Sequence, residues 1–195
     1  MKKNAILLFG ILILSVATIK AQDYVWDFGN DRTLFPIGIE YTEDTEVAGL
    51  LICPRAETNP MQIVQKYGRE QAGVPSTYKY CFSPNGSGYN GAKNTDEKPR
   101  RMTPDKRFLS FKVKENCIIK ARIMAPAKGA SASLFVTDGK NLLGTMTPNN
   151  EYNDVFTECT VSYSHIGEGE KTIYIFGNNN VRICYMEVKS ETDGK

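Results

Sequence analysis

Residues 107–125 constrain the fold most, because two segments of this stretch alternate between apolar and polar residues. In the first segment, 107–114, the apolar positions are every second residue, namely Leu109, Phe111 and Val113. The second segment, 117–125, has the same alternation and follows the pair Glu115-Asn116. A period of two is typical of an antiparallel strand with one buried face. We therefore predict a central hairpin of two strands joined by a tight turn.

Similar short strands recur along the chain, separated by residues that favour turns. We predict about eleven strands, at residues 23–28, 47–53, 61–67, 77–82, 107–114, 117–125, 133–137, 141–145, 155–163, 172–176 and 181–188. Asp138-Gly139 between two apolar runs is a typical hairpin signal, and the last two strands are expected to form another hairpin around 177–180. No long helical pattern is present. The predicted fold class is all-β, an antiparallel β-sandwich or jelly roll.

The first 21 residues have the pattern of a secretory signal peptide, with Lys2 and Lys3 before an apolar run and Ala21 at the expected cleavage position. The run, 5–17, is shorter than the roughly 20 residues of a membrane span, so cleavage is favoured over an uncleaved anchor. We expect a signal peptide (1–21), one β-sandwich domain (22–189) and a polar tail (190–195). The expected location is outside the cytoplasm: periplasmic, cell-surface associated or extracellular.

The charge balance gives no reason to expect a nucleic-acid partner. The chain has 24 basic and 22 acidic residues, and three of the basic ones, Lys2, Lys3 and Lys20, lie in the predicted signal peptide. The remaining 174 of the 195 residues then carry 21 basic and 22 acidic side chains. Nucleic-acid binding domains are usually strongly basic. No cysteine follows the apolar run before Cys53, so no lipid or other membrane anchor is expected.

The cysteine and histidine content predicts neither a metal site nor a cofactor. The five cysteines are widely spaced, and His165 is the only histidine, so zinc-ligand spacing is absent. We expect mostly free, buried thiols rather than a disulfide framework. The acidic residues Glu43, Asp44 and Glu46 lack the spacing of a calcium loop and are interpreted as a solvated turn. A structural calcium ion is left open and is not predicted.

Four loop residues are candidates for carbohydrate binding. Residues 83–106 form the longest irregular stretch, and long loops in compact domains are often functional. Tyr89 stands among glycines, where its ring would stack on a sugar, and Tyr152 lies in a second loop. Arg100 and Arg101 have the side chains that hold a carboxylate in bidentate fashion. The alternative is a flexible, solvated loop. Trp26, the only tryptophan, is interpreted as a core residue rather than a sugar platform.

The order of several phrases resembles that of a known group of modules. These phrases are Tyr-Val-Trp-Asp-Phe at 24–28, the apolar run 47–52, Gly-Ser-Gly at 86–88, Arg-Phe-Leu-Ser-Phe at 107–111, Leu-Phe-Val-Thr-Asp-Gly at 134–139 and the strand 181–188. Together they resemble the β-sandwich modules of secreted Bacteroidetes proteins, which are often attached to pectate lyases and other polysaccharide-degrading enzymes. The resemblance implies a jelly-roll fold and a role in carbohydrate recognition or polysaccharide utilisation. It does not imply lyase activity, because no solenoid repeat is present.

Three functions are weighed from these observations. The first is a secreted, non-catalytic carbohydrate-binding protein, accessory to the recognition or use of polysaccharides or oligosaccharides. The alternative is a periplasmic or surface module for structure or protein interaction, without a glycan ligand and with an unknown partner. The third is an enzyme with paired carboxylates, for which the available residues are Glu43, Asp44, Asp154 and Glu158. We rank catalysis last, because acidic residues in turns are usually solvated.

Overall fold

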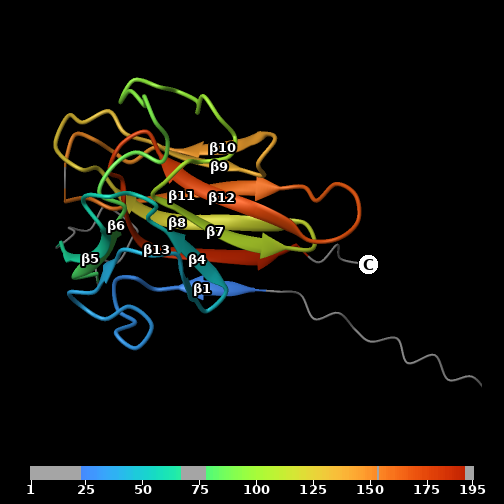
Figure 1. The fold of residues 1–195 in the computed structure, drawn as a ribbon, viewed down its shortest axis with the longest axis horizontal. Helices are drawn as coiled ribbons and strands as arrows, with labels where there is room; N and C mark the ends of the chain where they lie inside the picture. Colours follow the sequence, from blue (N-terminus) through green and yellow to red (C-terminus); the bar gives the residue numbers. More distant parts are fainter. Residues whose placement is uncertain (1–22, 67–77, 153, 192–195) are drawn as a thin grey trace, which may run out of the picture.

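The computed structural model describes residues 23–66, 78–152 and 154–191, which form two antiparallel β-sheets (Figure 1). Sheet A contains β1 (Tyr24–Trp26), β2 (Glu40–Tyr41), β5 (Met61–Gln65), β6 (Tyr80–Ser83), β8 (Cys117–Met124), β11 (Thr157–Tyr163) and β13 (Arg182–Ser190). Sheet B contains β3 (Thr45–Val47), β4 (Leu50–Cys53), β7 (Phe108–Val113), β9 (Leu134–Thr137), β10 (Leu142–Met146) and β12 (Lys171–Gly177). The described residues include no helix. The predicted all-β sandwich is confirmed.

The strand order shows how each sheet is assembled. Sheet A runs β11-β8-β13-β6-β5-β2, and β1 also pairs with β13. β1 and β6 share one edge of β13, because β1 pairs with residues 186–188 and β6 pairs at Ile183. Sheet B runs β10-β9-β12-β7-β4-β3. All the pairs are antiparallel. β12 and β13 are the last two strands of the chain, yet both lie inside their sheets, because each has neighbours on both edges.

The alternation noticed in the sequence determines which side of each strand is buried. Leu109 and Phe111 of β7 and Ile119 and Ile123 of β8 all belong to the main core between the sheets. Trp26 is completely buried in the same core, and its Nε1 donates a hydrogen bond to the Ala48 carbonyl at 3.1 Å. The interpretation of Trp26 as a core residue is therefore confirmed. Burial of large apolar side chains is the main favourable term for a fold of this kind.

Two of the predicted hairpins are wrong, although their strands are present. β7 belongs to sheet B and β8 to sheet A, so residues 114–116 lead from one sheet to the other. β12 and β13 are likewise in opposite sheets. Alternation with a period of two residues indicates which face of a strand is buried, but it does not indicate which strand lies beside it. Two strands that bury facing sides across a core satisfy the same pattern as two strands paired in one sheet.

The Asp-Gly hairpin is confirmed between β9 and β10, which pair directly. The Asp138 carboxylate accepts hydrogen bonds from the backbone N–H groups of Lys140 and Asn141, at 2.8 and 2.6 Å. Gly139 has a φ of +84°, a conformation that favours glycine. The single strand predicted at 47–53 is instead the hairpin β3–β4, with its turn at Ala48 and Gly49, both at positive φ.

The cysteines differ in part from the prediction of mostly free thiols. Cys81 of β6 and Cys184 of β13 form a disulfide, which the sequence analysis did not expect. Cys53, Cys117 and Cys159 are free, as predicted. Burial raises the pKa of the Cys53 thiol to about 12 and that of Cys117 to about 11, so both remain protonated at neutral pH.

The expected ends of the domain are only partly within the described residues. The predicted signal peptide, 1–21, lies outside them. At the other end, the predicted tail begins too early, because Ser190 pairs with Cys117 as the last residue of β13. The backbone N–H of Glu191 also donates to the Asn116 carbonyl at 2.9 Å. In the described part of the chain, no helix is long and apolar enough to cross a membrane.

Candidate functional site

The outer face of sheet B carries side chains from the positions that alternate with the core residues. In β7 these are Phe108, Ser110 and Lys112, and in β12 they are Thr172 and Tyr174, which line one groove. The groove has a volume of about 460 Å³. Four residue steps along β7, from Phe108 to Lys112, correspond to about 13 Å. An open groove of this length across several strands suits an elongated ligand.

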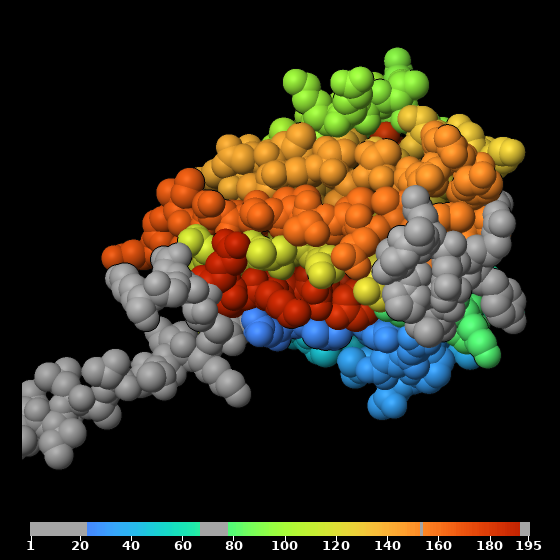
Figure 2. Space-filling model, turned by 180° about the vertical axis from the view of Figure 1, so that it is seen from behind, coloured from blue at the N-terminus to red at the C-terminus, as the bar shows by residue number. Residues whose placement is uncertain are grey.

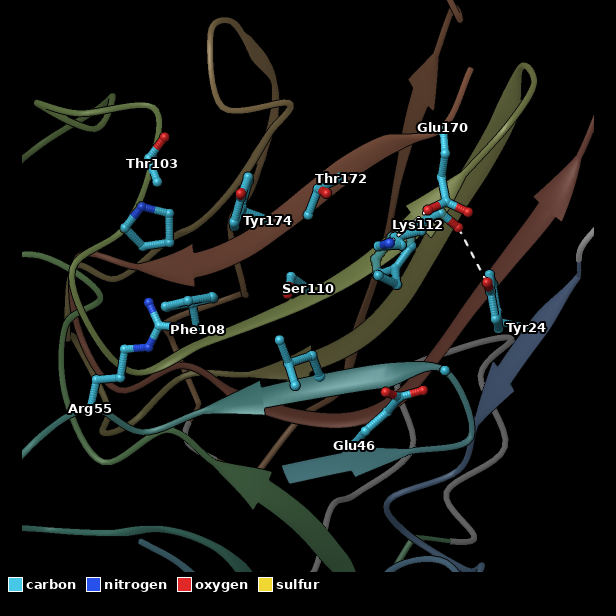
Figure 3. A pocket seen from close by; sticks show the side chains of 14 residues that line it. Tyr24, Glu46, Arg55, Thr103, Phe108, Ser110, Lys112, Glu170, Thr172 and Tyr174 are labelled. Carbon is cyan, nitrogen blue, oxygen red and sulfur yellow. Dashed lines mark hydrogen bonds and ion pairs between the residues drawn. The ribbon is translucent and has the colours of Figure 1, made fainter. Parts of the chain in front are cut away.

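The groove has an aromatic end and a charged end, and Figure 3 shows them on opposite sides of Ser110 and Thr172. We use "aromatic end" for Arg55, Thr103, Pro104, Phe108 and Tyr174. We use "charged end" for Tyr24, Glu46, Lys112 and Glu170. The remaining lining residues are Gly49, Leu51, Ser110, Phe111 and Thr172.

The aromatic end holds a half-buried tyrosine ring in a fixed position. The rings of Tyr174 and Phe108 meet edge to face with centroids 5.8 Å apart, a favourable arrangement for two aromatic side chains. The Arg55 guanidinium lies 5.1 Å from the centroid of the Phe108 ring. The Asp44 carboxylate accepts bonds from Arg55 Nη2 at 2.7 Å and Nε at 3.0 Å. Phe108 is buried, so Tyr174 supplies the ring surface that a ligand reaches.

The charged end presents both donors and acceptors. Lys112 Nζ and Glu170 Oε1 form an ion pair at 2.7 Å, and the Tyr24 hydroxyl donates to the Lys112 carbonyl at 3.2 Å. The hydrogen bond with Lys112 lowers the pKa of Glu170, and the same bond raises the pKa of Lys112. Burial and the carboxylates of Glu170 and Glu46 raise the pKa of Tyr24. At neutral pH this end therefore presents the ionised Glu170 carboxylate, the Lys112 ammonium group and the Tyr24 phenol hydroxyl, with the Glu46 side chain beside them.

The long loop covers the other part of the same face. Tyr89 packs against Phe135 and Phe176, with ring centroids 6.4 and 6.1 Å away. Its hydroxyl donates to Asp96 Oδ2 at 2.9 Å. The Asn178 side chain donates to the carbonyls of residues 94 and 96, each at 3.0 Å. These contacts fix the loop over the upper part of sheet B, above β9 and β10 in Figure 1.

The structure does not bring the four predicted loop residues together in one pocket, and none of them lines the groove. Tyr89 is 1% exposed, so its ring offers no face to a sugar, contrary to the expectation for a tyrosine among glycines. Arg100 and Arg101 are exposed, but they form ion pairs with Asp96 and Asp105 at 3.6 and 3.0 Å. Tyr152 is 45% exposed. A carbohydrate role for these three exposed residues stays a prediction.

Sequence reasoning missed the groove residues, although one signal was available. Tyr174 occupies an outward position in a strand whose inward positions are Ile173 and Ile175. An aromatic residue at one of the outward positions of a strand, which are usually polar, is a candidate for a surface site. Lys112 occupies a polar position of the alternating segment 107–114, but its neighbours across the groove come from β3, from β1 and from the end of the 164–170 turn. Only the strand order shows this proximity.

The described residues contain no group of three or more histidine, cysteine, aspartate or glutamate side chains placed to hold a metal ion. The acidic turn at 43–46 is used within the protein. Asp44 pairs with Arg55, and the Glu43 carbonyl accepts a bond from the Thr45 hydroxyl at 2.9 Å. Glu46 lines the groove.

Comparison with known proteins finds similarity only at the level of solved structures. No protein-family model and no curated protein matches the sequence. A Bacteroides thetaiotaomicron protein described as a "putative sugar binding protein" has a TM-score of 0.45 and 10% identity, and the match covers 79% of this chain and 96% of that one. A family 35 carbohydrate-binding module from Clostridium thermocellum has a TM-score of 0.38 and 12% identity, and the match covers 73% of this chain and 99% of that one. The C-terminal CBM6 of a Zobellia galactanivorans laminarinase has a TM-score of 0.35 and 12% identity, and the match covers 78% of this chain and 97% of that one.

Proposed function

We propose that the protein is an exported, non-catalytic carbohydrate-binding protein, located in the periplasm, at the cell surface or outside the cell. Its groove on sheet B binds an oligosaccharide or a segment of a polysaccharide, and the protein serves polysaccharide recognition or use. The observation that carries the proposal is the groove itself, which combines the half-buried Tyr174 ring with hydroxyl and charged groups at fixed positions.

The chemistry of the groove matches the two kinds of surface that a sugar presents. The apolar C–H face of a sugar ring packs on an aromatic ring, and Tyr174 supplies one at the aromatic end. Sugar hydroxyls both donate and accept hydrogen bonds. Ser110 and Thr172 do the same along the floor, while Lys112 donates and Glu46 accepts at the charged end. A mostly apolar groove with a few placed polar groups is typical of a small-molecule site.

The state of Glu170 supports binding rather than hydrolysis. Glycoside hydrolysis requires one carboxyl group that holds a proton at working pH and donates it to the leaving oxygen. Lys112 lowers the pKa of Glu170, which keeps that group ionised. The second carboxylate of the groove, Glu46, is exposed to solvent. Glu170 therefore lacks the raised pKa of a general acid.

The test is binding of purified residues 22–195 to a broad glycan array, with and without calcium, followed by titration of any ligand found. We expect Tyr174→Ala to weaken binding at least about tenfold, equivalent to about 1.4 kcal/mol. Tyr152→Ala removes an exposed tyrosine outside the groove and serves as the matched control. It is expected to leave the affinity within about twofold, which is less than about 0.5 kcal/mol.

Two outcomes contradict the proposal in different ways. If Tyr152→Ala or the double variant Arg100→Ala/Arg101→Ala abolishes binding and Tyr174→Ala does not, the ligand binds to the loops and not to the groove. If folded protein binds no glycan at all, the carbohydrate function is wrong. A module for structure or protein interaction would then be the better description, and crosslinking would be used to identify its partner.

A further inference from the structure

A second pocket adjoins the aromatic end of the groove and differs from it in composition. It has a volume of about 370 Å³ and is lined by Arg55, Ala56, Glu57, Thr58, Asn90, Asp105, Lys106 and Arg107. Arg55 is the one residue that lines both. Where the groove combines an aromatic ring with hydroxyls, this second pocket is lined almost entirely by polar and charged side chains. We call it the basic pocket, because three of its lining residues are cations.

Arg107 is the central feature of the basic pocket, because its charge is buried and no carboxylate among residues 23–66, 78–152 and 154–191 forms an ion pair with it. The residue is 8% exposed, and its Nη2 donates to the Thr58 carbonyl at 2.6 Å. Within the described residues, its Nε has no hydrogen-bond partner. Burial lowers the pKa of Arg107. A buried charge is costly unless an opposite charge or a set of hydrogen bonds compensates it, and the Thr58 carbonyl is a neutral acceptor.

The backbone holds Arg107 in this position against its own preference. Its φ is +46°, an unfavourable value for a residue with a long side chain. The backbone N–H of Arg107 donates to the Pro54 carbonyl at 2.9 Å, which fixes the turn. Arg55, which also lines the pocket, has a φ of +40°. Backbone strain of this kind often occurs at functional sites, and here both strained arginines line one pocket.

The other ionic groups leave the basic pocket with an excess of positive charge. Lys106 Nζ donates to the neutral Asn90 side chain at 2.8 Å. The Asp105 carboxylate already accepts bonds from Arg101 at 3.0 Å and from the Asn90 N–H at 3.2 Å. Arg55 is paired with Asp44. The positive charges of Lys106 and Arg107 therefore face one remaining carboxylate, that of the exposed Glu57.

We propose that the basic pocket is a binding site for a small oxyanion (a carboxylate, sulfate or phosphate group) held by Lys106 and Arg107. Such a group would place acceptor oxygens against two cations and compensate the buried guanidinium. Charge-assisted hydrogen bonds from arginine and lysine to oxyanions are among the strongest in proteins. The anion is either free in solution or a substituent of a sugar chain that also lies in the groove, since Arg55 belongs to both sites.

The first experiment titrates inorganic sulfate and inorganic phosphate into the protein at low ionic strength, followed by calorimetry and NMR shifts. We expect saturable binding of at least one of them, and a loss of about tenfold or more in Lys106→Gln, because bonds to charged groups are worth roughly that factor. Lys98→Gln is the matched control. It removes the same charge from an exposed position of the 83–106 loop outside the pocket, and it should retain the affinity.

A second variant keeps the test valid if the buried arginine is needed for folding. Arg107→Lys retains the charge but loses the planar guanidinium, so it should weaken binding while thermal unfolding reports whether the fold is intact. Lys106→Gln changes a half-exposed side chain and is expected to fold normally. The proposal is overturned if neither anion binds saturably up to about 10 mM, an affinity of only about 3 kcal/mol. It is also overturned if Lys98→Gln weakens binding as much as Lys106→Gln.

This test does not depend on the proposed function of the groove. Tyr174→Ala should leave the affinity for inorganic anions unchanged. If this variant loses anion binding, the proposal that the basic pocket is a separate site is wrong. A pair of oligosaccharides, with and without a uronate or sulfate group, then identifies the source of the anion. If the charged sugar binds more tightly and Lys106→Gln removes that advantage, the anion is a sugar substituent. If the two sugars bind equally while inorganic anions still bind, the ligand is a free anion. Both results support the site.

Discussion

The outer faces of the two sheets show how one strand pattern produces two different surfaces. On sheet A, Lys120 lies between Glu158 and Glu187, at 3.7 and 3.4 Å, and Arg122 pairs with Glu158 at 3.1 Å. Figure 2 shows this face, with β8 in yellow, β13 in red and β1 in blue lying side by side. On sheet B the outward positions hold Tyr174, Ser110 and Thr172 and form a groove. On sheet A the charged side chains pair across neighbouring strands, whereas the groove on sheet B combines one such ion pair, Lys112–Glu170, with ring and hydroxyl surface.

The largest expected effect comes from weakening the contact between the 83–106 loop and the outer face of sheet B. Tyr89→Ala removes a buried ring that packs on Phe135 and Phe176, and such truncations usually cost about 3–5 kcal/mol. We expect a loss of that size in the free energy of unfolding, measured with chemical denaturant. Tyr152→Ala, at an exposed tyrosine, should change it by less than about 0.5 kcal/mol. Equal effects of the two variants would show that the loop does not pack on sheet B as described.

A smaller effect is expected on the outer face of sheet A. Glu158→Gln removes the carboxylate that Lys120 and Arg122 share. Exposed ion pairs contribute roughly 0.2–1 kcal/mol each, so we expect a modest loss in the free energy of unfolding that shrinks as salt is added. Glycan affinity should not change. A clear loss of glycan binding in this variant would place the ligand on sheet A and reverse the comparison between the faces.

The smallest expected effect is the pH dependence of the groove. Lys112 lowers the pKa of Glu170 below its ordinary value of 4.5 and Glu170 raises that of Lys112 above 10.5, so the pair stays ionised between these limits. The contribution of the Glu170 carboxylate to the stability of the fold is complete above pH 4.5, and it is lost as the pH falls through the lowered pKa of this group. The affinity for a neutral oligosaccharide should change by less than about twofold between about pH 5 and pH 9. A steep change within that range would show that another titrating group holds the ligand.

The sequence predicted which residues form the core more fully than which strands are neighbours. The alternation in β7 and β8 correctly placed Leu109, Phe111 and Ile119 inside. It did not show that the two strands belong to opposite sheets, because both arrangements bury the same side chains. The Asp138-Gly139 hairpin was predictable because its local hydrogen bonds and positive φ define the turn by themselves.

The candidate site was harder to predict, because it depends on contacts between distant segments. Tyr89 among glycines suggested an exposed ring, but the Gly88 N–H donates to the Gly177 carbonyl at 2.8 Å. A side chain at Gly88 would meet the Phe176 Cβ at 2.5 Å. The glycine therefore lets the loop approach sheet B closely, and that approach buries Tyr89. Tyr174 was missed because its partners in the groove come from four other parts of the chain.

The position of β13 determines the order in which the fold can be completed. This last strand pairs with β8 on one side and with β1 and β6 on the other. A chain emerging from the ribosome therefore lacks the middle of sheet A until residues 182–190 have appeared. The earlier strands of that sheet can pair in two groups, β2 with β5 and β6, and β8 with β11, but only β13 joins the groups. Sheet A is therefore completed only when the end of the chain is available, because its central pairings join residues that are far apart in the sequence.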